Sequence, residues 1–391
     1  MPTIAIYASR ILTPQEEVSD GVILVEHSKI VSIGHRDEIQ VPSDAIHYAA
    51  PGSTVVPGFV DIHIHGAGGH DVMEGTDRAL DKITETVAMH GTTSIAATTV
   101  TASAADTCSS LEGIARYIRN HEQPVASSNL AAEIVGIHLE GPFISKAKRG
   151  VHPAKALAQP DPQLFDTFVR AAEGLVRLVT IAPELPGALK LIEHAAASGV
   201  VPAFGHTDAD YDQARAGIQA GIRHAVHAYN AMRPFTHRDP GVLGAILTDP
   251  EVTAEVIADG HHVAGPAIQV LMGTKGFETV ILVSDGIAAT SMPDGIYPLG
   301  GLEVTVKDGV CRNEEGKLAG STLTLDRALR YVVALGVPFP DAVKMVTIQP
   351  ARRLGLAGKK GILAPGSDAD LVVLTPDLRV EGVMTRGTGL I

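Results

Sequence analysis

The sequence lacks the residues on which several classes of protein depend. Its 391 residues include no tryptophan and only two cysteines, Cys108 and Cys311, which are far apart and form no CxxC pair. This spacing argues against a disulfide framework and against a cysteine metal knuckle. With 8 Phe and 7 Tyr against 17 His, the chain has few aromatic platforms and many imidazoles. Attention therefore turns to the histidines.

Long apolar runs and an excess of basic residues are also missing. No stretch reaches the roughly 18 apolar residues of a membrane helix, and the first residues lack the pattern of a signal peptide. We therefore expect a cytoplasmic protein without a membrane segment. The formal charge of −13 argues against a nucleic-acid-binding face, because phosphate backbones need clustered Lys and Arg. A small anionic substrate needs only one or two local cations.

Eight short apolar runs, separated by stretches long enough for a helix, occupy residues 55 to 286. In order they are "VVPGFVDIHIHG", "TTSIAATT", "AEIVGIHLEGP", "VRLVTIAPE", "VVPAFGHT", "RHAVHAYNAM", "VTAEVIADG" and "TVILVSDG". Apolar strands alternating with helices predict an α/β fold in which a parallel sheet closes into a (β/α)8 TIM barrel. After the fifth run we expect a helix with Thr207 and Asp208 as N-cap candidates.

The composition changes on both sides of this region. Residues 3 to 54 and 361 to 384 contain short strand-like runs broken by Gly, Pro and Asp turns. We expect a small β-sandwich domain built from residues 1–54 and 351–391, around a catalytic barrel of residues 55–350. A β-hairpin insertion at about residues 300–320 is expected after the last barrel strand.

Polar residues gather at the C-terminal ends of the eight runs. They are His63, His65, Glu140, Glu184, His206, His227, Asp259 and Asp285. In a (β/α)8 barrel these strand ends meet at one mouth, where active sites lie. The first run ends in "GFVDIHIHG", in which Asp61, His63 and His65 alternate and so share one face of a strand. This convergence predicts a functional site.

The ligand types at this mouth favour a divalent metal. Glu140, His206 and His227 supply a two-His, one-carboxylate set with a position left open for water, as in a catalytic zinc site. His63 and His65 can hold a second ion with Glu140 as the bridge. The alternatives are that single histidines are rim or core residues, or that one of the pair only donates a hydrogen bond to a ligand. The residues alone do not fix the number of ions.

Asp285 ends the last run and is the candidate proton carrier. A carboxylate beside an activated water can accept its proton and later deliver it to a leaving group. The alternative is an Asp that caps the turn through Gly286. Its place on the last barrel strand favours catalysis, so the residues alone predict a metal-dependent hydrolase.

The motifs also carry a resemblance to a known family. "VPGFVDIHIHG", "GIHLEGPF", "KRGVHP", "FGHTDA", "HAYNAM", "RDPG", "ADGHHV", "VSDG" and "AGSTLTLDRALR" resemble the successive motifs of the N-acetylglucosamine-6-phosphate deacetylases, within the amidohydrolase superfamily. The resemblance spans nearly the whole chain. It implies a barrel with a small β-domain, a homodimer, and hydrolysis of N-acetylglucosamine 6-phosphate to glucosamine 6-phosphate and acetate.

The resemblance implies roles for the reacting groups. Glu140, His206 and His227 match metal ligands, and Asp285 matches the catalytic acid and base. The pair His63 and His65 places the chain among members able to hold one or two ions, Zn first, with Fe, Mn, Co or Cd as substitutes.

The resemblance implies a second set of residues, which hold the substrate. His152 of "KRGVHP" matches a histidine that binds the substrate and helps to polarise the acetamide carbonyl. Asn230 and Ala231 match positions that hold the sugar. Arg238 and His262 match groups that meet the phosphate, with Arg238 reaching over from the neighbouring subunit, and a forked guanidinium suits that task.

Three alternatives stay open. The same machinery can act on N-acetylgalactosamine 6-phosphate or on an unphosphorylated N-acyl compound, and "HAYNAM" and "VSDG" differ from the commoner "HLFNAM" and "TDA" forms. A cyclic amide is a second possibility, although such relatives commonly carry a bridging modified lysine where this chain has Glu140. A barrel that only senses an amino-sugar phosphate is the third.

Overall fold

The computed structural model describes residues 3–13, 16–122 and 129–390. Residues 1, 2 and 391, at the outer ends of the expected small domain, therefore lie outside the described residues. Within these ranges, no helix is both long enough and apolar enough to cross a membrane.

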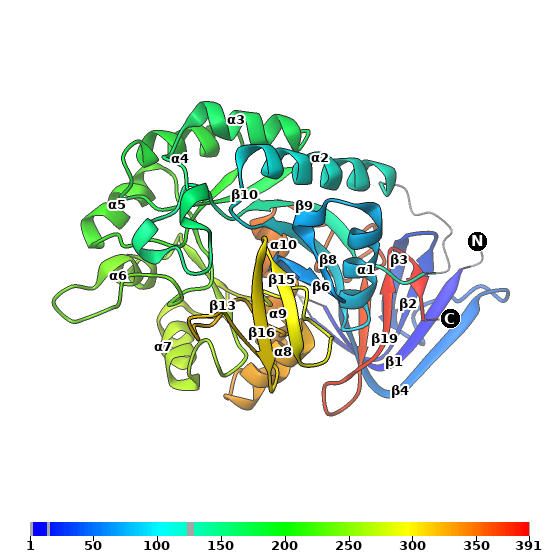
Figure 1. The fold of residues 1–391 in the computed structure, drawn as a ribbon. Helices are drawn as coiled ribbons and strands as arrows, with labels where there is room; N and C mark the ends of the chain where they lie inside the picture. Colours follow the sequence, from blue (N-terminus) through cyan, green and yellow to red (C-terminus); the bar gives the residue numbers. More distant parts are fainter. Residues whose placement is uncertain (1–2, 14–15, 123–128, 391) are drawn as a thin grey trace.

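A closed parallel barrel forms the larger part of the molecule (Figure 1). Its strands are β5 (Phe59–Ile64), β8 (Thr92–Thr99), β9 (Glu133–Leu139), β10 (Val176–Ile181), β11 (Val201–Phe204), β12 (His224–Ala225), β13 (Thr253–Ile257) and β14 (Val280–Val283). Each pairs with its chain neighbour, and a parallel bridge between Ile64 and Gly286 brings the last strand back to the first. The predicted (β/α)8 barrel is confirmed.

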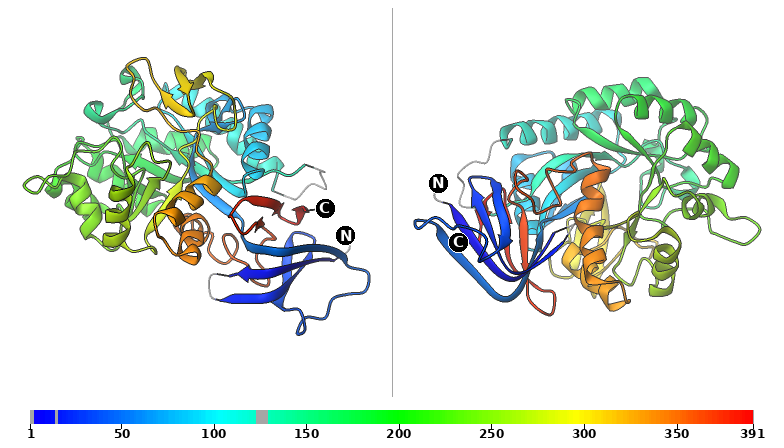
Figure 2. Two further views of the ribbon diagram at one scale, coloured as in Figure 1. Left: turned by 90° about the horizontal axis from the view of Figure 1, so that it is seen from below. Right: turned by 180° about the vertical axis from the view of Figure 1, so that it is seen from behind.

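Helices surround the barrel because each presents one apolar face to it, as α1 does through Leu80, Ile83 and Val87 (Figures 1 and 2). They are α1 (Asp77–Ala88), α2 (Ala104–Asn120), α3 (Pro162–Ala171), α4 (Ala188–Ala197), α5 (Tyr211–Ala220), α6 (Gly241–Thr248), α7 (Gly265–Lys275) and α8 (Leu325–Ala334), followed by α9 (Phe339–Val346) and α10 (Ile348–Arg353).

The start of α5 corrects one expectation. Its N-cap is Asp210, which exchanges hydrogen bonds with Gln213, and not Thr207 or Asp208. Glu184 explains the difference, because its carboxylate accepts hydrogen bonds from the Thr207 hydroxyl at 2.6 Å and from the Asp208 N–H at 2.7 Å. Glu184 therefore ties two loops together at the end of β10.

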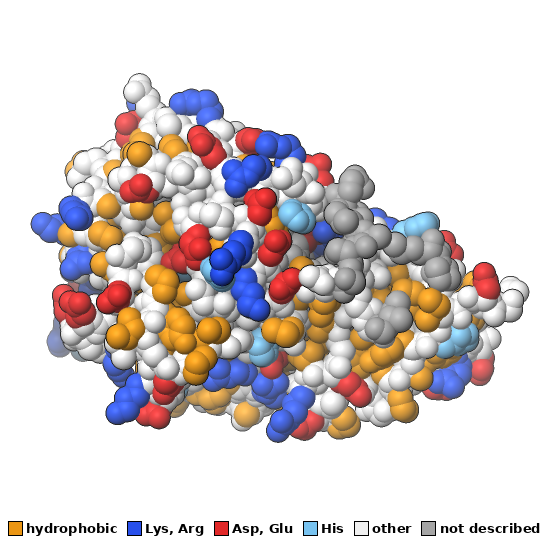
Figure 3. Space-filling view, turned by 45° about the vertical axis from the view of Figure 1, so that its right-hand side comes forward, with side chains coloured by type: hydrophobic (Ala, Val, Ile, Leu, Met, Phe, Trp, Pro, Cys, Tyr) orange, Lys and Arg blue, Asp and Glu red, His pale blue; other side chains and the backbone are white. Residues whose placement is uncertain are grey.

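Both chain ends build a separate β-sheet, as predicted (Figure 2). Its strands are β1 (Ile4–Leu12), β2 (Glu17–Glu26), β3 (Lys29–His35), β4 (Ile46–Pro57), β18 (Leu371–Leu374), β19 (Val380–Thr385) and β20 (Thr388–Gly389). The ends join where Val55 of β4 pairs with Val373 of β18. The sheet has a core of its own around Ile6 and Leu371. Hydrophobic side chains gather on this side of the molecule in Figure 3, whereas acidic and basic side chains are mixed elsewhere on that face.

Short elements frame the mouth of the barrel. They are the hairpin β6 (Gly66–Ala67) and β7 (His70–Asp71), the 3-10 turns at Val72–Glu74, Lys146–Lys148 and Ala154–Ala156, and the sheet β15 (Gly295–Leu299), β16 (Leu302–Lys307) and β17 (Val310–Arg312). The β15–β17 sheet packs Leu299, Val304 and Cys311 against Val100 and Ile287 beside the strand ends. It thus forms one wall of the entrance.

Candidate active site at the barrel mouth

A cavity of about 470 Å³ opens at the C-terminal ends of the barrel strands. That volume suits a small molecule. The predicted site residues that line it are His65, Glu140, His152, His206, His227, Asn230, Ala231, His262 and Asp285. His63 lies beneath them with its side chain fully buried. The structure therefore brings together nearly all of the residues that the sequence selected.

The Glu140 carboxylate lies at the centre of this cluster and is 3% exposed. Its Oε1 atom is 2.9 Å from Nε2 of His227 and 3.2 Å from Nε2 of His206. Its Oε2 atom is 3.3 Å from Nε2 of both His65 and His152. With Nε2 of His63, which is 3.3 Å from Oε1, one carboxylate thus faces five imidazoles.

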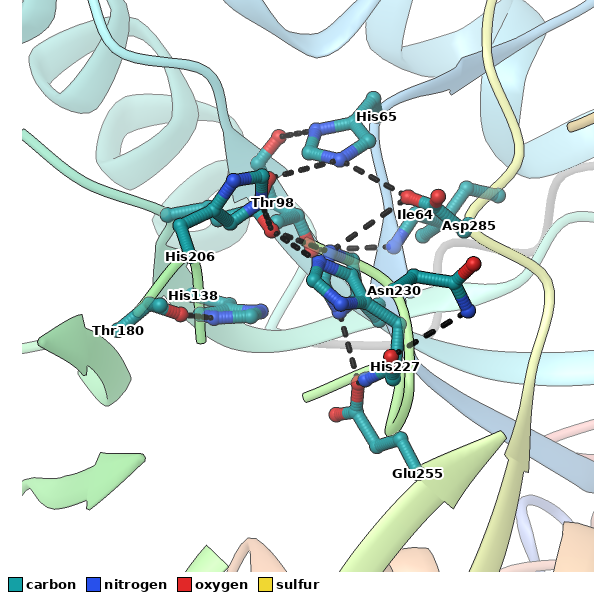
Figure 4. A network of polar contacts seen from close by, with 12 residues as sticks. Ile64, His65, Thr98, His138, Thr180, His206, His227, Asn230, Glu255 and Asp285 are labelled. Atoms are coloured by element: carbon teal, nitrogen blue, oxygen red, sulfur yellow. Dashed lines mark hydrogen bonds and ion pairs between the residues drawn. The ribbon is translucent and has the colours of Figure 1, made fainter. Parts of the chain in front are cut away.

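Asp285, which follows the end of β14 by two residues, completes the cluster. Its Oδ1 atom lies 3.2 Å from Nε2 of His65 and 3.6 Å from Nε2 of His63, which is in turn 3.3 Å from Oε1 of Glu140. In Figure 4 the rings of His65, His206 and His227 and the Asp285 carboxylate face a common centre. The ligand atoms of His63, Glu140 and His227, and those of His63, His65 and Asp285, are close enough to share an ion.

Hydrogen bonds on the side of each ring away from the cavity determine which nitrogen carries the proton and which presents its lone pair to the cavity. Nδ1 of three histidines lies beside a group that can only accept: His65 at the carbonyl oxygen of Thr98 (3.1 Å), His206 at that of Lys148 (2.9 Å) and His63 at Oε2 of Glu255 (2.8 Å). Each Nδ1 therefore carries the proton, and Nε2 is free to bind a cation. Nε2 of His63 is buried and without a hydrogen-bond partner among the described residues. These donors fit a divalent metal.

His152 has the opposite arrangement. The backbone N–H of Thr101 donates to its Nδ1 at 3.2 Å, and the Thr101 hydroxyl lies 2.8 Å from the same nitrogen and can also donate to it. The N–H can only donate, so the ring proton lies on Nε2, which faces the cavity. Burial, with the nearby charge of His206, lowers the pKa of His152 to about 4. Although its Nε2 atom is close enough to share an ion with Glu140 and His206, this tautomer makes His152 a neutral hydrogen-bond donor.

Dense packing of acids and imidazoles moves several pKa values. Burial works against the charged form of His65, but its contacts with Asp285 and Glu140 raise its pKa to about 9. Burial opposes ionisation of Glu140, yet the charges of His63 and His206 hold its pKa well below the usual value. The site thus gathers positive charge around its carboxylates, and a divalent cation can replace those protons.

Left-handed backbone is concentrated in the same place. His206, His227 and Asp285 each follow the last residue of their strand by two positions, and their φ angles are 48°, 29° and 50°. Ala231 has φ 51°. The turn at Asp285 is held by Ser321, whose N–H donates to the Asp285 carbonyl oxygen at 2.8 Å. Such costly backbone conformations are common where side chains must be aimed at a reaction centre.

The residues expected to hold the substrate differ in whether they reach the cavity. Nδ1 of His262 is 2.7 Å from Oδ2 of Asp259, and this contact outweighs burial and raises the pKa of His262. Asn230 and Ala231 line the cavity beside His227. Arg238 is exposed on the loop before α6 and does not line the cavity that the described residues form. A phosphate contact by Arg238 would therefore need a second copy of the chain, and this stays a prediction.

Sequence reasoning missed two groups of residues. The cations Lys146, Lys148, Arg149 and Lys317 line the cavity rim. Glu255, His138 and His224 lie fully buried in the barrel below the cluster. The signal for Glu255 was a lone carboxylate inside the apolar run "VTAEVIADG", because an unpaired charge is not stable in a buried strand. The rim cations belong to loops and gave no periodic signal.

A (β/α)8 barrel with histidines and carboxylates around a small-molecule cavity at its mouth is the arrangement of a barrel hydrolase. The model of the amidohydrolase family matches residues 54–389. The chain therefore belongs to the amidohydrolase family and is a hydrolase, as the sequence predicted.

Similar proteins agree with this assignment. The chain is 36% identical to N-acetylglucosamine-6-phosphate deacetylase of Vibrio furnissii, over 97% of this chain and 93% of that protein. It is also 36% identical to N-acetylgalactosamine-6-phosphate deacetylase of Escherichia coli O157:H7, over 95% and 93%. The solved structure of a mutant N-acetyl-D-glucosamine-6-phosphate deacetylase from Mycobacterium smegmatis, in complex with N-acetyl-D-glucosamine-6-phosphate, matches all of both chains with a TM-score of 0.92 and 38% identity.

Proposed function

We propose that this enzyme hydrolyses the N-acetyl group of N-acetylglucosamine 6-phosphate, giving glucosamine 6-phosphate and acetate. The observation that carries the proposal is the division of tautomers at the mouth. His63, His65 and His206 have an acceptor at Nδ1 and can present the lone pair of Nε2 to a cation, whereas His152 has a donor at Nδ1 and presents an N–H from the same cluster. Amide hydrolysis needs both a cation site and a neutral donor for the developing oxyanion.

The ligands of the proposed metal site are Glu140, His206 and His227, with His63 and His65 available for a second ion bridged by Glu140. A divalent ion bound there supplies a Lewis acid that activates water and polarises an amide carbonyl. Nitrogen and carboxylate ligands favour zinc over Ca²⁺ or Mg²⁺, which prefer oxygen alone. The number of ions is part of the proposal.

Proton transfer is assigned to Asp285. Burial disfavours its charged form, but the hydrogen bond with His65 and the charge of His63 hold its pKa below the usual value. The group is therefore an ionised acceptor at neutral pH. It takes the proton of the attacking water and gives it to the departing amine. The Nε2–H of His152 donates to the carbonyl oxygen as negative charge builds there.

The phosphate is assigned to the cationic side of the cavity. His262, held charged by Asp259, and Arg238 of a second copy bind the phosphate oxygens, while Asn230 and Ala231 bind the sugar. Lys146 and Lys148 add positive charge at the rim of a protein with net charge −13. A homodimer is part of this proposal.

A comparison of three sugars tests the substrate. Acetate release is measured with metal-loaded enzyme and N-acetylglucosamine 6-phosphate, N-acetylgalactosamine 6-phosphate or unphosphorylated N-acetylglucosamine. We expect the first to have the highest kcat/KM and the third to be poor. The 36% identity to a relative named for each hexosamine makes the epimer comparison necessary. Equal turnover with and without the phosphate would refute the phosphate contacts.

A further inference from the structure

Glu255 lies below the cluster on β13, and its side chain is fully buried. Its Oε2 atom is 2.8 Å from Nδ1 of His63 and accepts the backbone N–H of His227 at 3.2 Å. Its Oε1 atom is 2.8 Å from Nε2 of His224. Figure 4 shows the carboxylate on the side of His227 away from the cavity. Both oxygens are therefore engaged, which is what an ionised carboxylate needs in a barrel interior.

The ring of His63 is fixed from two directions. Glu255 holds its Nδ1 edge, and the ring of His138 packs against it at a centroid distance of 4.7 Å and an interplanar angle of 80°. His138 is itself held by the Thr180 hydroxyl, 2.9 Å from its Nε2. Nε2 of His63 then faces Glu140 at 3.3 Å. The ring has little freedom to turn this atom away.

Among the three lone-pair histidines, His63 alone is held by an ionised side chain. Nδ1 of His65 and of His206 donates to backbone carbonyl oxygens, which no substitution removes directly. The carboxylate behind His63 fixes its tautomer and also increases the basicity of its free nitrogen. The contact behind His63 can therefore be changed by replacing one residue.

We propose that Glu255 is a positioning residue that makes His63 a metal ligand, by holding the proton on Nδ1 and the lone pair of Nε2 toward Glu140 and Asp285. The proposal rests on the proposed function only in requiring that the site binds a divalent cation. His224 completes the arrangement, because it occupies the second oxygen of Glu255 and is 2.7 Å from the Thr253 hydroxyl through Nδ1.

Glu255→Gln tests the proposal with almost no change in shape. If the amide oxygen faces His63, the contact survives without its charge. If the NH2 group faces His63, Nδ1 becomes an acceptor and the proton moves to Nε2. His63 is a poorer ligand in both orientations.

The measurement is Co²⁺ binding to metal-free, full-length protein, followed by equilibrium dialysis and by visible absorption. We expect wild type to bind two ions per chain. Glu255→Gln should lower the affinity for one of them about ten- to a hundredfold, with little effect on the affinity for the other. His63→Asn should weaken the same ion. Equal affinities in Glu255→Gln and wild type would overturn the proposal, and so would a wild-type stoichiometry of one ion that His63→Asn leaves unchanged.

Asp61→Asn is the matched control. Asp61 is a buried carboxylate beside the same histidine, but its Oδ1 accepts the backbone N–H groups of His63 and Ser284, each at 3.3 Å, and the Ser284 side chain also donates to Asp61. An asparagine oxygen can accept both, so Co²⁺ affinity should match wild type. If Asp61→Asn weakened the same ion as strongly as Glu255→Gln, the specific role of Glu255 would be lost.

A second readout does not depend on the Glu255→Gln variant. In Zn²⁺-loaded wild type labelled with 15N-histidine, the ring signals that disappear in His63→Asn should report Nδ1 as protonated and Nε2 as carrying no proton. An Nε2–H tautomer would overturn the proposal. Neither experiment involves a sugar, so failure of the deacetylase reaction and failure of the Glu255 role give different results.

Discussion

The backbone N–H of Thr101 donates to Nδ1 of His152, which turns the Nε2–H of this ring into the cavity. A fixed donor at Nδ1 distinguishes His152 from His63, His65 and His206, which have acceptors there. A ring with a protonated, cavity-facing Nε2 stabilises an oxyanion and does not coordinate a cation. The two kinds of histidine should therefore respond differently to substitution.

Replacing His152 should slow turnover without removing metal. Loss of one oxyanion donor typically lowers kcat about a hundred- to a thousandfold, and His152→Asn should do so while bound metal per chain stays at the wild-type value. His194→Asn is the control, because His194 is paired with Asp166 outside the cavity. If His152→Asn lost its metal, His152 would be a ligand instead.

Asp285→Asn should nearly abolish turnover and spare the metal held by Glu140, His206 and His227. A positioned acid and base contributes about a hundred- to ten thousandfold. Steady-state kinetics and metal analysis of the same preparation check both parts. Asp212→Asn, on the exposed surface of α5, should behave as wild type. An Asp285→Asn enzyme that kept most of its rate would refute the assignment.

Chelation should inactivate the enzyme reversibly. Dialysis against a chelator should remove activity, and Zn²⁺, Co²⁺, Mn²⁺, Fe²⁺ or Cd²⁺ should restore it to different extents. Glu140→Gln should bind metal weakly and should not recover on addition of metal, because Glu140 faces five imidazoles. Full activity of a preparation proved metal-free would contradict a metal mechanism.

Metal-free protein should lose stability as the pH rises above neutrality. The folded-state pKa of His65, about 9, is above the ordinary value of 6.5, so folding favours its protonated form. The contribution of His65 to the free energy of unfolding is complete below pH 6.5 and disappears as the pH rises through about 9. The difference between these two pKa values corresponds to about 3 kcal/mol. Thermal unfolding at pH 6.5 and 9.5 should show a lower Tm at the higher pH.

Metal-loaded protein provides the comparison for that experiment. A bound cation displaces the proton from His65, so its Tm should depend less on pH over the same interval. If metal-free and metal-loaded protein lost the same stability between pH 6.5 and 9.5, the pH dependence would have another origin.

Arg238 offers a test of the second subunit. Arg238→Ala should raise KM for the phosphorylated sugar about ten- to a hundredfold, as expected for loss of a hydrogen bond from a charged group. Mixed dimers of Arg238→Ala and Asp285→Asn should regain a low KM, because one site then combines an intact Asp285 with the partner's intact arginine. Absence of recovery in verified mixed dimers would contradict a contribution across the interface.

The sequence predicted the barrel and most of the cavity because both follow from strand periodicity. Apolar runs such as "TTSIAATT" became buried strands, and polar residues at their ends met at one mouth, as parallel strands require. His206, His227 and Asp285 lie at the same position relative to their strands. Strand ends were therefore a sufficient guide to these three.

The contacts made by residues outside that pattern were not predictable. Glu255 acts across the barrel on His63, which is 192 positions away in the chain, and its partner is known only once β13 and β5 are placed in one barrel. The predicted N-cap of α5 was wrong because Glu184, in the turn after β10, accepts a hydrogen bond from the Thr207 hydroxyl. The tautomer of His152 depends on one N–H of Thr101, a contact without a sequence signature.

The most direct test of the central claim is proton NMR of N-acetylglucosamine 6-phosphate incubated with metal-loaded enzyme. Free acetate and glucosamine 6-phosphate should appear in equal amounts at a rate proportional to the enzyme concentration. Chelation of the metal should stop this reaction, and addition of the same metal should restore its rate. A sugar that binds the protein, broadens its signals and stays acetylated would contradict the account, because the barrel would then be a sensor and not a deacetylase.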